Sequence, residues 1–281
     1  MIRRIAVLGA GTMGHGIAHA AVAAGYDTHL FDLSPDALEN GRTAIETIVG
    51  QGVDLGKISA GEADAIVRRL HITTILASAL DGCDFVIEAA PERLDVKIAL
   101  LSEVDRLVSA HAVIATNTSA LSITELASAT TAPARVAGMH FFNPVHKMKL
   151  VEIVQALDSA PATLDAIDRV AKQMGKETVL VRESPGFITT RVNASIGNEA
   201  FYMLMEGVAS ARDIDKALKL GLNHPMGPFE LVDLVGLDTR LSILEYLHRS
   251  MGEKYRPCPL LAQYVKAGRL GRKTGRGVYD Y

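Results

Sequence analysis

The stretch RIAVLGAGTMGHGIAHAAVAA, residues 4–24, constrains the fold more strongly than any other part of the chain. A short apolar run, rich in β-branched residues, leads directly into the sequence GAGTMG at residues 9–14, and a helix-like apolar pattern follows. A G-x-G-x-x-G motif alone is weak evidence, because loops often contain several glycines. Between a strand and a helix, however, the motif is typical of a βαβ unit that binds a dinucleotide.

Each glycine of this motif has a distinct expected role. Gly9 permits the tight turn, Gly11 lets the backbone approach a pyrophosphate, and Gly14 lets helix and strand pack closely. The N-terminus of the helix then presents unpaired N–H groups to the phosphates. We expect Thr12 and Met13, which lie in the same loop, to contact the cofactor as well.

The second apolar run, DTHLFD, ends at Asp32, about twenty residues after the motif, where a dinucleotide-binding unit places an acidic residue. A carboxylate there accepts hydrogen bonds from the ribose hydroxyls and repels a 2′-phosphate. No arginine or lysine follows before Arg42. The sequence therefore predicts NAD rather than NADP as cofactor; the alternative is a glycine-rich turn followed by a surface aspartate.

The periodicity of apolar residues divides the chain into two parts. Up to Ser184, short strand-like runs alternate with helix-like segments, which predicts an α/β domain: a Rossmann-type, doubly wound, largely parallel sheet with helices on both faces. After Pro185-Gly186 the pattern is helical, which predicts an all-α C-terminal domain. We place the domains at residues 1–184 and 185–281. Strands are expected at 4–9, 27–32, 84–90, 112–118, 135–140, 149–154 and 178–184, and helical segments at 187–208, 211–221 and 229–251.

Composition excludes several classes of partner. A net charge of −3 gives no electrostatic basis for binding nucleic acid, and no apolar stretch approaches the length of a membrane helix. The two cysteines, Cys83 and Cys258, form no C-x-x-C pair, which indicates a reducing compartment; we expect a cytoplasmic protein. His15 and His19 lie one helical turn apart but lack the glutamate of a zinc-binding H-E-x-x-H motif, so we expect no metal.

The stretch GMHFFNPVHKMKLVEIV, residues 138–154, contains the strongest candidates for chemistry. His140 ends one predicted strand, and Glu152 lies inside the apolar strand that returns beside it. Oxidation of an alcohol requires a group that removes the hydroxyl proton, and a histidine suits this role near neutral pH. We therefore predict that His140 is the acid/base and that Glu152 orients its ring. We also predict that a hydroxyl such as that of Ser119, at the end of IATNTS, binds the substrate oxygen. The structural alternative is a core histidine beside an edge-strand carboxylate.

Seven motifs occur along the chain in this order: GAGTMG, NTSALSI, GMHFFNPV, MKLVEIV, SPGF, NHPMGPFELVDLVGLDT and LGRKTGRGVYDY. With these motifs, the sequence resembles the 3-hydroxyacyl-CoA dehydrogenase family over essentially its whole length. The resemblance implies reversible, NAD-dependent oxidation of an L-(S)-3-hydroxyacyl-CoA, such as 3-hydroxybutyryl-CoA, to the 3-ketoacyl-CoA. It also implies a homodimer joined by the C-terminal domain.

The resemblance assigns further residues to the site. His140 and Glu152 match the family's acid/base pair, and Ser119 matches the serine that binds the 3-oxygen of the substrate. In SPGFITTR, Thr190 stands where the family usually has asparagine, so its contact with substrate is a departure from the pattern. The matching cofactor contacts are Glu92, Lys97, Asn143 and Lys273.

Two other functions remain open from the sequence. In the segment 42–59, family members often have several lysines that meet CoA phosphates, but this chain has only Arg42 and Lys57 there. Together with Thr190, this leaves a related dehydrogenase of a free hydroxy acid or sugar acid as an alternative. The other is a non-catalytic dinucleotide-binding protein.

Overall fold

The computed structural model describes residues 2–281, and the chain forms two compact units, Met1–Glu183 and Ser184–Tyr281. The change from one unit to the other falls next to Pro185-Gly186, where the apolar periodicity of the sequence changes from mixed to purely helical. Each unit has its own buried apolar side chains, and the two are described separately below.

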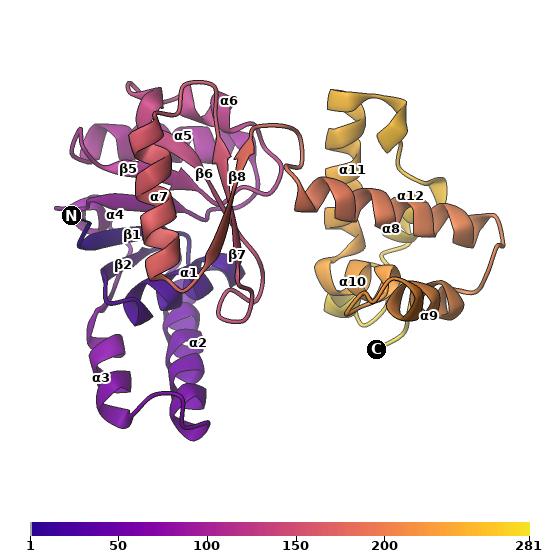
Figure 1. Ribbon diagram of the computed structural model, residues 1–281, viewed down its shortest axis with the longest axis horizontal. Coiled ribbons are helices and arrows are strands. Elements are labelled where there is room, and N and C mark those ends of the chain that lie inside the picture. The colour runs from indigo at the N-terminus through magenta and orange to yellow at the C-terminus, as the bar shows by residue number, and fades with distance from the viewer. Residues whose placement is uncertain (1) are drawn as a thin grey trace. The chain divides into compact units, whose positions relative to one another are not determined.

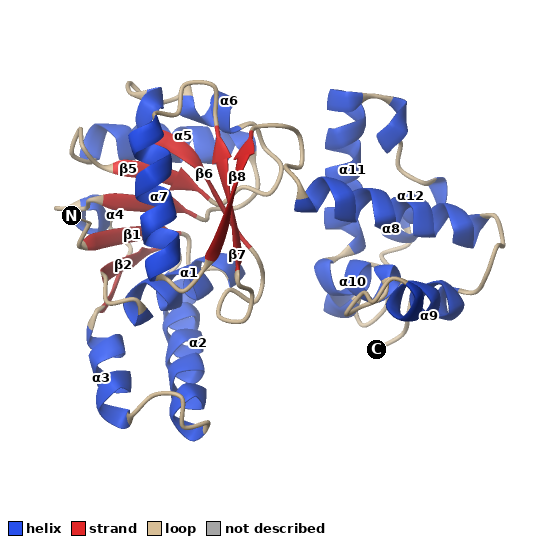
Figure 2. Cartoon of the chain, viewed as in Figure 1, coloured by secondary structure: helices blue, strands red, loops and turns tan. Residues whose placement is uncertain are grey.

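The N-terminal unit is built on one eight-stranded sheet with the order β3-β2-β1-β4-β5-β6-β7-β8 (Figures 1 and 2). Every neighbouring pair is parallel except β6 and β7, which are antiparallel. The strand order reverses between β1 and β4, and ligands of doubly wound sheets bind at such a switch point. The strands are β1 Arg4–Leu8, β2 Asp27–Phe31, β3 Leu70–Thr73, β4 Phe85–Glu88, β5 Val113–Thr116, β6 Val136–Phe141, β7 Leu150–Gln155 and β8 Glu177–Arg182.

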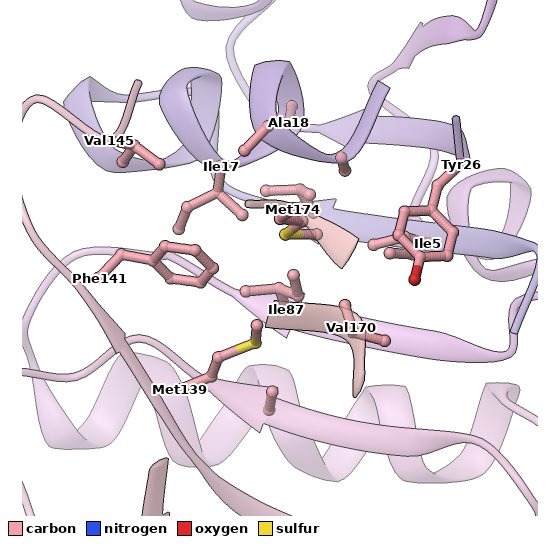
Figure 3. Packing of buried hydrophobic residues seen from close by; sticks show 14 of the residues in the cluster. Ile5, Ile17, Ala18, Tyr26, Ile87, Met139, Phe141, Val145, Val170 and Met174 are labelled. Carbon is pink, nitrogen blue, oxygen red and sulfur yellow. The ribbon is translucent and has the colours of Figure 1, made fainter. Parts of the chain in front are cut away.

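Helices cover both faces of this sheet. One apolar cluster joins the sheet to α1, α2 and α7, and Figure 3 shows Ile17 of α1, Ile87 of β4 and Val170 of α7 packed together within it. The second cluster joins the opposite face to α4, α5 and α6. Among residues 2–281, no helix has both the length and the apolar character needed to cross a membrane. The helices are α1 Thr12–Ala23, α2 Pro35–Asp54, α3 Ala60–Arg68, α4 Leu76–Leu80, α5 Leu94–Leu107, α6 Ile123–Ala127 and α7 Pro161–Gln173, with a 3₁₀ helix at Pro133–Arg135.

Strand β3 was not predicted from the sequence. It is only four residues long, LHIT, and it pairs with β2 alone, at the edge of the sheet. Its side chains are half-buried or exposed, so it lacks the continuous apolar run by which buried parallel strands are recognised. A strand of this kind carries almost no periodicity signal.

The C-terminal unit consists of helices packed on one apolar core. The predicted segment 229–251 is two helices, because Gly236 between them has φ of +109°, a conformation open mainly to glycine. Ser210 caps the helix that begins at Ala211, since its Oγ accepts a hydrogen bond from Asp213 N at 3.2 Å. The helices are α8 Thr189–Met205, α9 Ala211–Gly221, α10 Pro228–Val235, α11 Leu237–Met251 and α12 Pro259–Lys266, with 3₁₀ helices at Glu253–Tyr255 and Arg272–Thr274.

Candidate active site

The candidate residues of the N-terminal unit follow the carboxyl ends of its parallel strands. The glycine loop comes after β1, Asp32 after β2, Glu92 after β4 and Ser119 after β5, while His140 lies near the end of β6. Because β1, β2, β4, β5 and β6 all run in the same direction, these ends lie along one edge of the sheet.

The geometry of the glycine loop explains why each of its glycines is needed. Gly9 has φ of +108°, and a Cβ built on it would lie 2.5 Å from Ala89 O. A Cβ on Gly14 would lie 1.6 Å from Gly9 O, so a larger residue cannot replace it without movement of the loop. A Cβ on Gly11, in contrast, would meet no protein atom within 4 Å. Gly11 therefore opens space beside the N-terminus of α1, where a phosphate group can approach the backbone.

Asp32 is held beside this loop by backbone donors. Its Oδ2 accepts a hydrogen bond from Ala10 N at 2.8 Å, and its Oδ1 accepts one from Ser34 N at 3.0 Å. The neighbouring Gly9 N donates to Phe31 O at 2.7 Å, which ties the loop to the end of β2. A half-exposed carboxylate fixed next to a phosphate loop can accept hydrogen bonds from ribose hydroxyls.

A buried ion pair lies where β4 meets the next loop. Glu88, the last residue of β4, is fully buried, and its Oε1 accepts hydrogen bonds from Lys97 Nζ at 2.6 Å and Ala90 N at 2.7 Å. Its Oε2 accepts the Thr116 hydroxyl hydrogen bond at 2.5 Å. Sequence reasoning missed Glu88, although a glutamate that ends an otherwise apolar strand was a signal. Lys97, predicted to contact the cofactor, is only 1 % exposed and serves this pair, so its cofactor contact stays a prediction.

Glu92 links this ion pair to the predicted substrate serine. Its Oε1 accepts hydrogen bonds from the Thr118 hydroxyl and from Ser119 N, both at 2.7 Å. Its Oε2 lies 3.5 Å from Lys97 Nζ. The structure thus brings Glu92, Lys97 and Ser119 together, and Glu92 fixes the backbone from which the Ser119 hydroxyl projects.

His140 and Glu152 are cross-strand neighbours. The antiparallel register of β6 and β7 pairs them directly, and His140 Nδ1 lies 2.7 Å from Glu152 Oε2. His140 is 4 % exposed and Glu152 is fully buried. Away from bulk water, such a hydrogen bond fixes the orientation of the ring. With Nδ1 engaged by the carboxylate, Nε2 is the nitrogen through which His140 would exchange a proton with substrate.

The loop after His140 is anchored on three sides. The buried Asn117 accepts a hydrogen bond from Phe141 N on its Oδ1 at 2.8 Å, which joins the ends of β5 and β6. Lys176 donates from Nζ to Val145 O and to Met148 O, the latter at 2.9 Å. A Cβ on Gly16 would lie 2.9 Å from Val145 Cγ2, so the loop packs closely on α1. Exposed Asn143 lies within this loop, before a cis peptide bond to Pro144, and its cofactor contact stays a prediction.

Thr190 and Lys273 belong to the C-terminal unit. Thr190 is half-buried in the first turn of α8, and Lys273 donates from Nζ to Asp238 Oδ1 at 2.6 Å. A pocket of about 320 Å³ is lined by Ile188, Val192 and Ile196, at the start of α8, and by further residues of which half are polar; Thr190 is not among them. The predicted roles of Thr190 at the substrate and of Lys273 at the cofactor remain predictions.

Comparison with known proteins gives matches along nearly the whole chain. Residues 4–184 match the family model of the 3-hydroxyacyl-CoA dehydrogenase NAD binding domain, and residues 186–281 match the model of its C-terminal domain. A probable 3-hydroxybutyryl-CoA dehydrogenase of Bacillus subtilis is 46% identical, over 100% of this chain and 98% of that protein. A 3-hydroxybutyryl-CoA dehydrogenase of Bradyrhizobium diazoefficiens is 43% identical, over 100% of this chain and 96% of that protein.

A solved structure is similarly close. The crystal structure of (S)-3-hydroxybutyryl-CoA dehydrogenase from Ralstonia eutropha superposes with a TM-score of 0.96 and 41% sequence identity, covering 100% of this chain and 99% of that one. The similarity therefore covers both units of the chain.

Proposed function

Because the chain belongs to the 3-hydroxyacyl-CoA dehydrogenase family, we propose that it interconverts (S)-3-hydroxybutyryl-CoA and acetoacetyl-CoA, with His140 as the acid/base. The chain is an NAD-dependent oxidoreductase that acts on a CH–OH group. The observation that carries the assignment of the acid/base is the buried hydrogen bond between His140 and Glu152 near the end of the parallel sheet.

His140 and Glu152 act together in the proton transfer of the proposed reaction. His140 takes the hydroxyl proton on Nε2 as the substrate carbon is oxidised, and Glu152 stabilises the imidazolium that results. In reduction the same protonated ring returns the proton to the substrate oxygen. A positioned acid/base of this kind typically contributes about 10²- to 10⁴-fold to the rate.

In this proposal the hydroxyl of Ser119 binds the same substrate oxygen atom. Its backbone is held by Glu92, which is itself held by Thr118 and lies near Lys97. A hydroxyl fixed in this way can donate a hydrogen bond to the substrate oxygen, on which negative charge develops in reduction.

When NAD is bound, its nicotinamide would supply the hydride acceptor for this oxidation. The loop at residues 9–14 fits its pyrophosphate, because Gly11 leaves the backbone open beside the N-terminus of α1. Asp32 fits the ribose hydroxyls of the adenosine half, since backbone hydrogen bonds already fix its carboxylate next to that loop.

We also propose that the protein is a homodimer joined through the C-terminal unit and that it works in the cytoplasm. Exposed large apolar side chains are concentrated in that unit, including Val208, Leu220 and Leu222, at 64%, 76% and 64% exposure. Apolar exposure of this extent is typical of a surface that another molecule covers. The two buried free cysteines agree with a reducing compartment.

Absorbance at the NADH band tests the proposed reaction. We expect NADH oxidation with acetoacetyl-CoA but none with free acetoacetate, and far slower oxidation of NADPH. His140→Gln should lower kcat by at least about 10²-fold while NADH affinity stays nearly constant. Equal turnover of free acetoacetate would instead support the dehydrogenase of a free hydroxy acid, and binding of NADH without any turnover would support the non-catalytic alternative.

A further inference from the structure

We propose that Asp27, His29 and His71 form a binding site for one zinc ion, or a similar divalent transition-metal ion, at the outer edge of the sheet. Among residues 2–281, these three are the group whose ligand atoms, from histidine and carboxylate side chains, all lie within 4.8 Å of one another. Asp27 begins β2, whereas Asp32 follows its last residue, so the group is separate from the cofactor loop.

The sheet itself brings the three side chains together. In the parallel register of β2 and β3, His29 pairs directly with His71. Asp27 lies two residues before His29 on the same strand, so both side chains project from the same face. The histidine rings lie with centroids 4.8 Å apart. Two regular strands therefore hold the backbone positions of all three residues next to one another.

The carboxylate of Asp27 lies between Arg4 on one side and the two histidines on the other. Arg4 donates from Nε to Oδ2 at 2.9 Å and from Nη1 to Asp81 O at 2.8 Å, so its guanidinium is fixed on one side. On the other side, Oδ1 lies 2.8 Å from His71 Nε2, and His29 Nε2 lies 3.9 Å from Oδ2. Carboxylates that bind metal ions are commonly hydrogen-bonded by a further group on their second oxygen, and Arg4 has this position.

The distances suit a small ion after a modest adjustment. Three atoms within 4.8 Å of one another have a common point within about 2.8 Å of each, whereas zinc needs about 2.0–2.2 Å. Shifts of less than about 1 Å would close this difference, and the side chain of His71 is 50% exposed and can move. Two imidazoles and one carboxylate select zinc, nickel, copper or cobalt rather than magnesium or calcium.

The competing interpretation is an aspartate–histidine hydrogen bond with no ion. A bound ion would replace that hydrogen bond and link β2 to β3 directly, which should stabilise the edge of the sheet by mass action. The two interpretations differ in whether the chain binds metal at all and in whether both histidines are required.

Zinc titration of the full chain without a polyhistidine tag tests the proposal, after removal of metal with a chelator. In competition with a chromophoric chelator we expect one zinc ion per chain with Kd below about 10 µM, and a Tm that rises with added zinc. Cobalt should give the visible absorption of a four-coordinate site. His29→Gln and His71→Gln should each weaken binding at least about tenfold, since each removes one ligand. The matched control is His111→Gln, which changes an exposed histidine outside the group.

Circular dichroism without metal shows whether each variant is folded, so a lost site is not confused with a lost fold. A wild-type Kd above about 100 µM would overturn the proposal. Binding that survives both substitutions in folded protein would also overturn it, and would place the ion at other histidines such as His15, His19 and His146. Activity need not change in any of these variants, because the group lies apart from the proposed catalytic residues.

Discussion

The buried carboxylate of Glu152 is stable in the sheet because it meets His140 at 2.7 Å. An unpaired carboxylate at that depth would be strongly disfavoured, so the pair is coupled in stability as well as in chemistry. Glutamine at position 152 can still accept the hydrogen bond of the ring, but it provides no negative charge. The substitution therefore separates orientation of His140 from electrostatic stabilisation.

For Glu152→Gln we expect kcat to fall about 10²- to 10⁴-fold, because the imidazolium formed in turnover loses its counter-charge. The Kd for NADH should change less than about threefold. Steady-state kinetics and NADH titration measure both quantities. Glu177→Gln, at an exposed position on the neighbouring strand β8, is the matched control. Unchanged kcat in Glu152→Gln would show that the acid/base acts without the carboxylate.

His19 gives a prediction about pH. Burial, followed by the nearby charges of His146, Lys176 and His15, lowers the pKa of His19 to about 4. The unfolded chain binds a proton at this position near pH 6.5, whereas the folded chain does not until about pH 4. Stability from this group is therefore present above pH 6.5 and is lost as pH falls from 6.5 to 4, by about 3 kcal/mol in total.

The test compares urea unfolding of wild type and His19→Gln at pH 7.5 and pH 5. The variant should lose less free energy of unfolding between these pH values than wild type does, whatever its stability at pH 7.5. His111→Gln, which changes an exposed histidine, should keep the wild-type difference. Identical pH dependence in wild type and His19→Gln would mean that other groups dominate acid destabilisation.

Candidate site residues that lie close together in sequence, or on strands with a clear apolar pattern, could be identified without a structure. Asp32 and the pairing of His140 with Glu152 follow from strand ends and a short return between two strands. The group of Asp27, His29 and His71 could not be found in this way, because β3 itself has no clear apolar pattern. The side-chain networks of the site depend on contacts that no local pattern encodes.

The turn between β1 and α1 is the element that we propose binds the cofactor's pyrophosphate. A Cβ on Gly14 would overlap other atoms of the protein, whereas a Cβ on Gly11 would meet none. Alanine at position 14 should therefore affect mainly folding, and alanine at position 11 mainly cofactor binding. Gly11 has φ of −66°, which alanine adopts without strain.

We expect Gly11→Ala to change Tm by less than about 2 °C and to raise the Kd for NADH at least about tenfold, because the methyl group occupies space that the pyrophosphate needs. Gly14→Ala should lower Tm by more than about 5 °C, because its Cβ overlaps Gly9 O. Differential scanning fluorimetry and NADH titration measure the two effects. Normal NADH affinity in Gly11→Ala would place the phosphates away from this loop.

At the level of elements, sequence pattern predicts regular structure and misses its interruptions. Seven of the strands lie in runs that the sequence marks as apolar and β-branched, because buried parallel strands have this composition. The break between α10 and α11 was missed, since Gly236 within an apolar helical pattern does not by itself show a positive φ. Helix interruptions of this kind depend on tertiary packing.

At the scale of the whole molecule, both units combine apolar cores with buried carboxylates that accept hydrogen bonds. The N-terminal unit has two apolar clusters on the faces of a sheet. In the C-terminal unit, buried carboxylates hold the end of the chain against the helices. Asp233 of α10 accepts hydrogen bonds from Val278 N at 2.8 Å and Tyr279 N at 2.9 Å, and from the Tyr281 hydroxyl at 3.0 Å. The sequence showed the helices of this unit but gave no signal for this network.

Asp233→Ala should lower the free energy of unfolding by about 3 kcal/mol, because three hydrogen-bond donors lose their shared acceptor in a buried site. Asp233→Asn should cost less, since one amide oxygen still accepts. Asp238→Ala is the matched control: it breaks a half-exposed ion pair with Lys273 and should cost no more than about 1 kcal/mol. The chain has no tryptophan, so urea unfolding is followed by circular dichroism. Equal losses in Asp233→Ala and Asp238→Ala would show that the C-terminal residues contribute little to the stability of this unit.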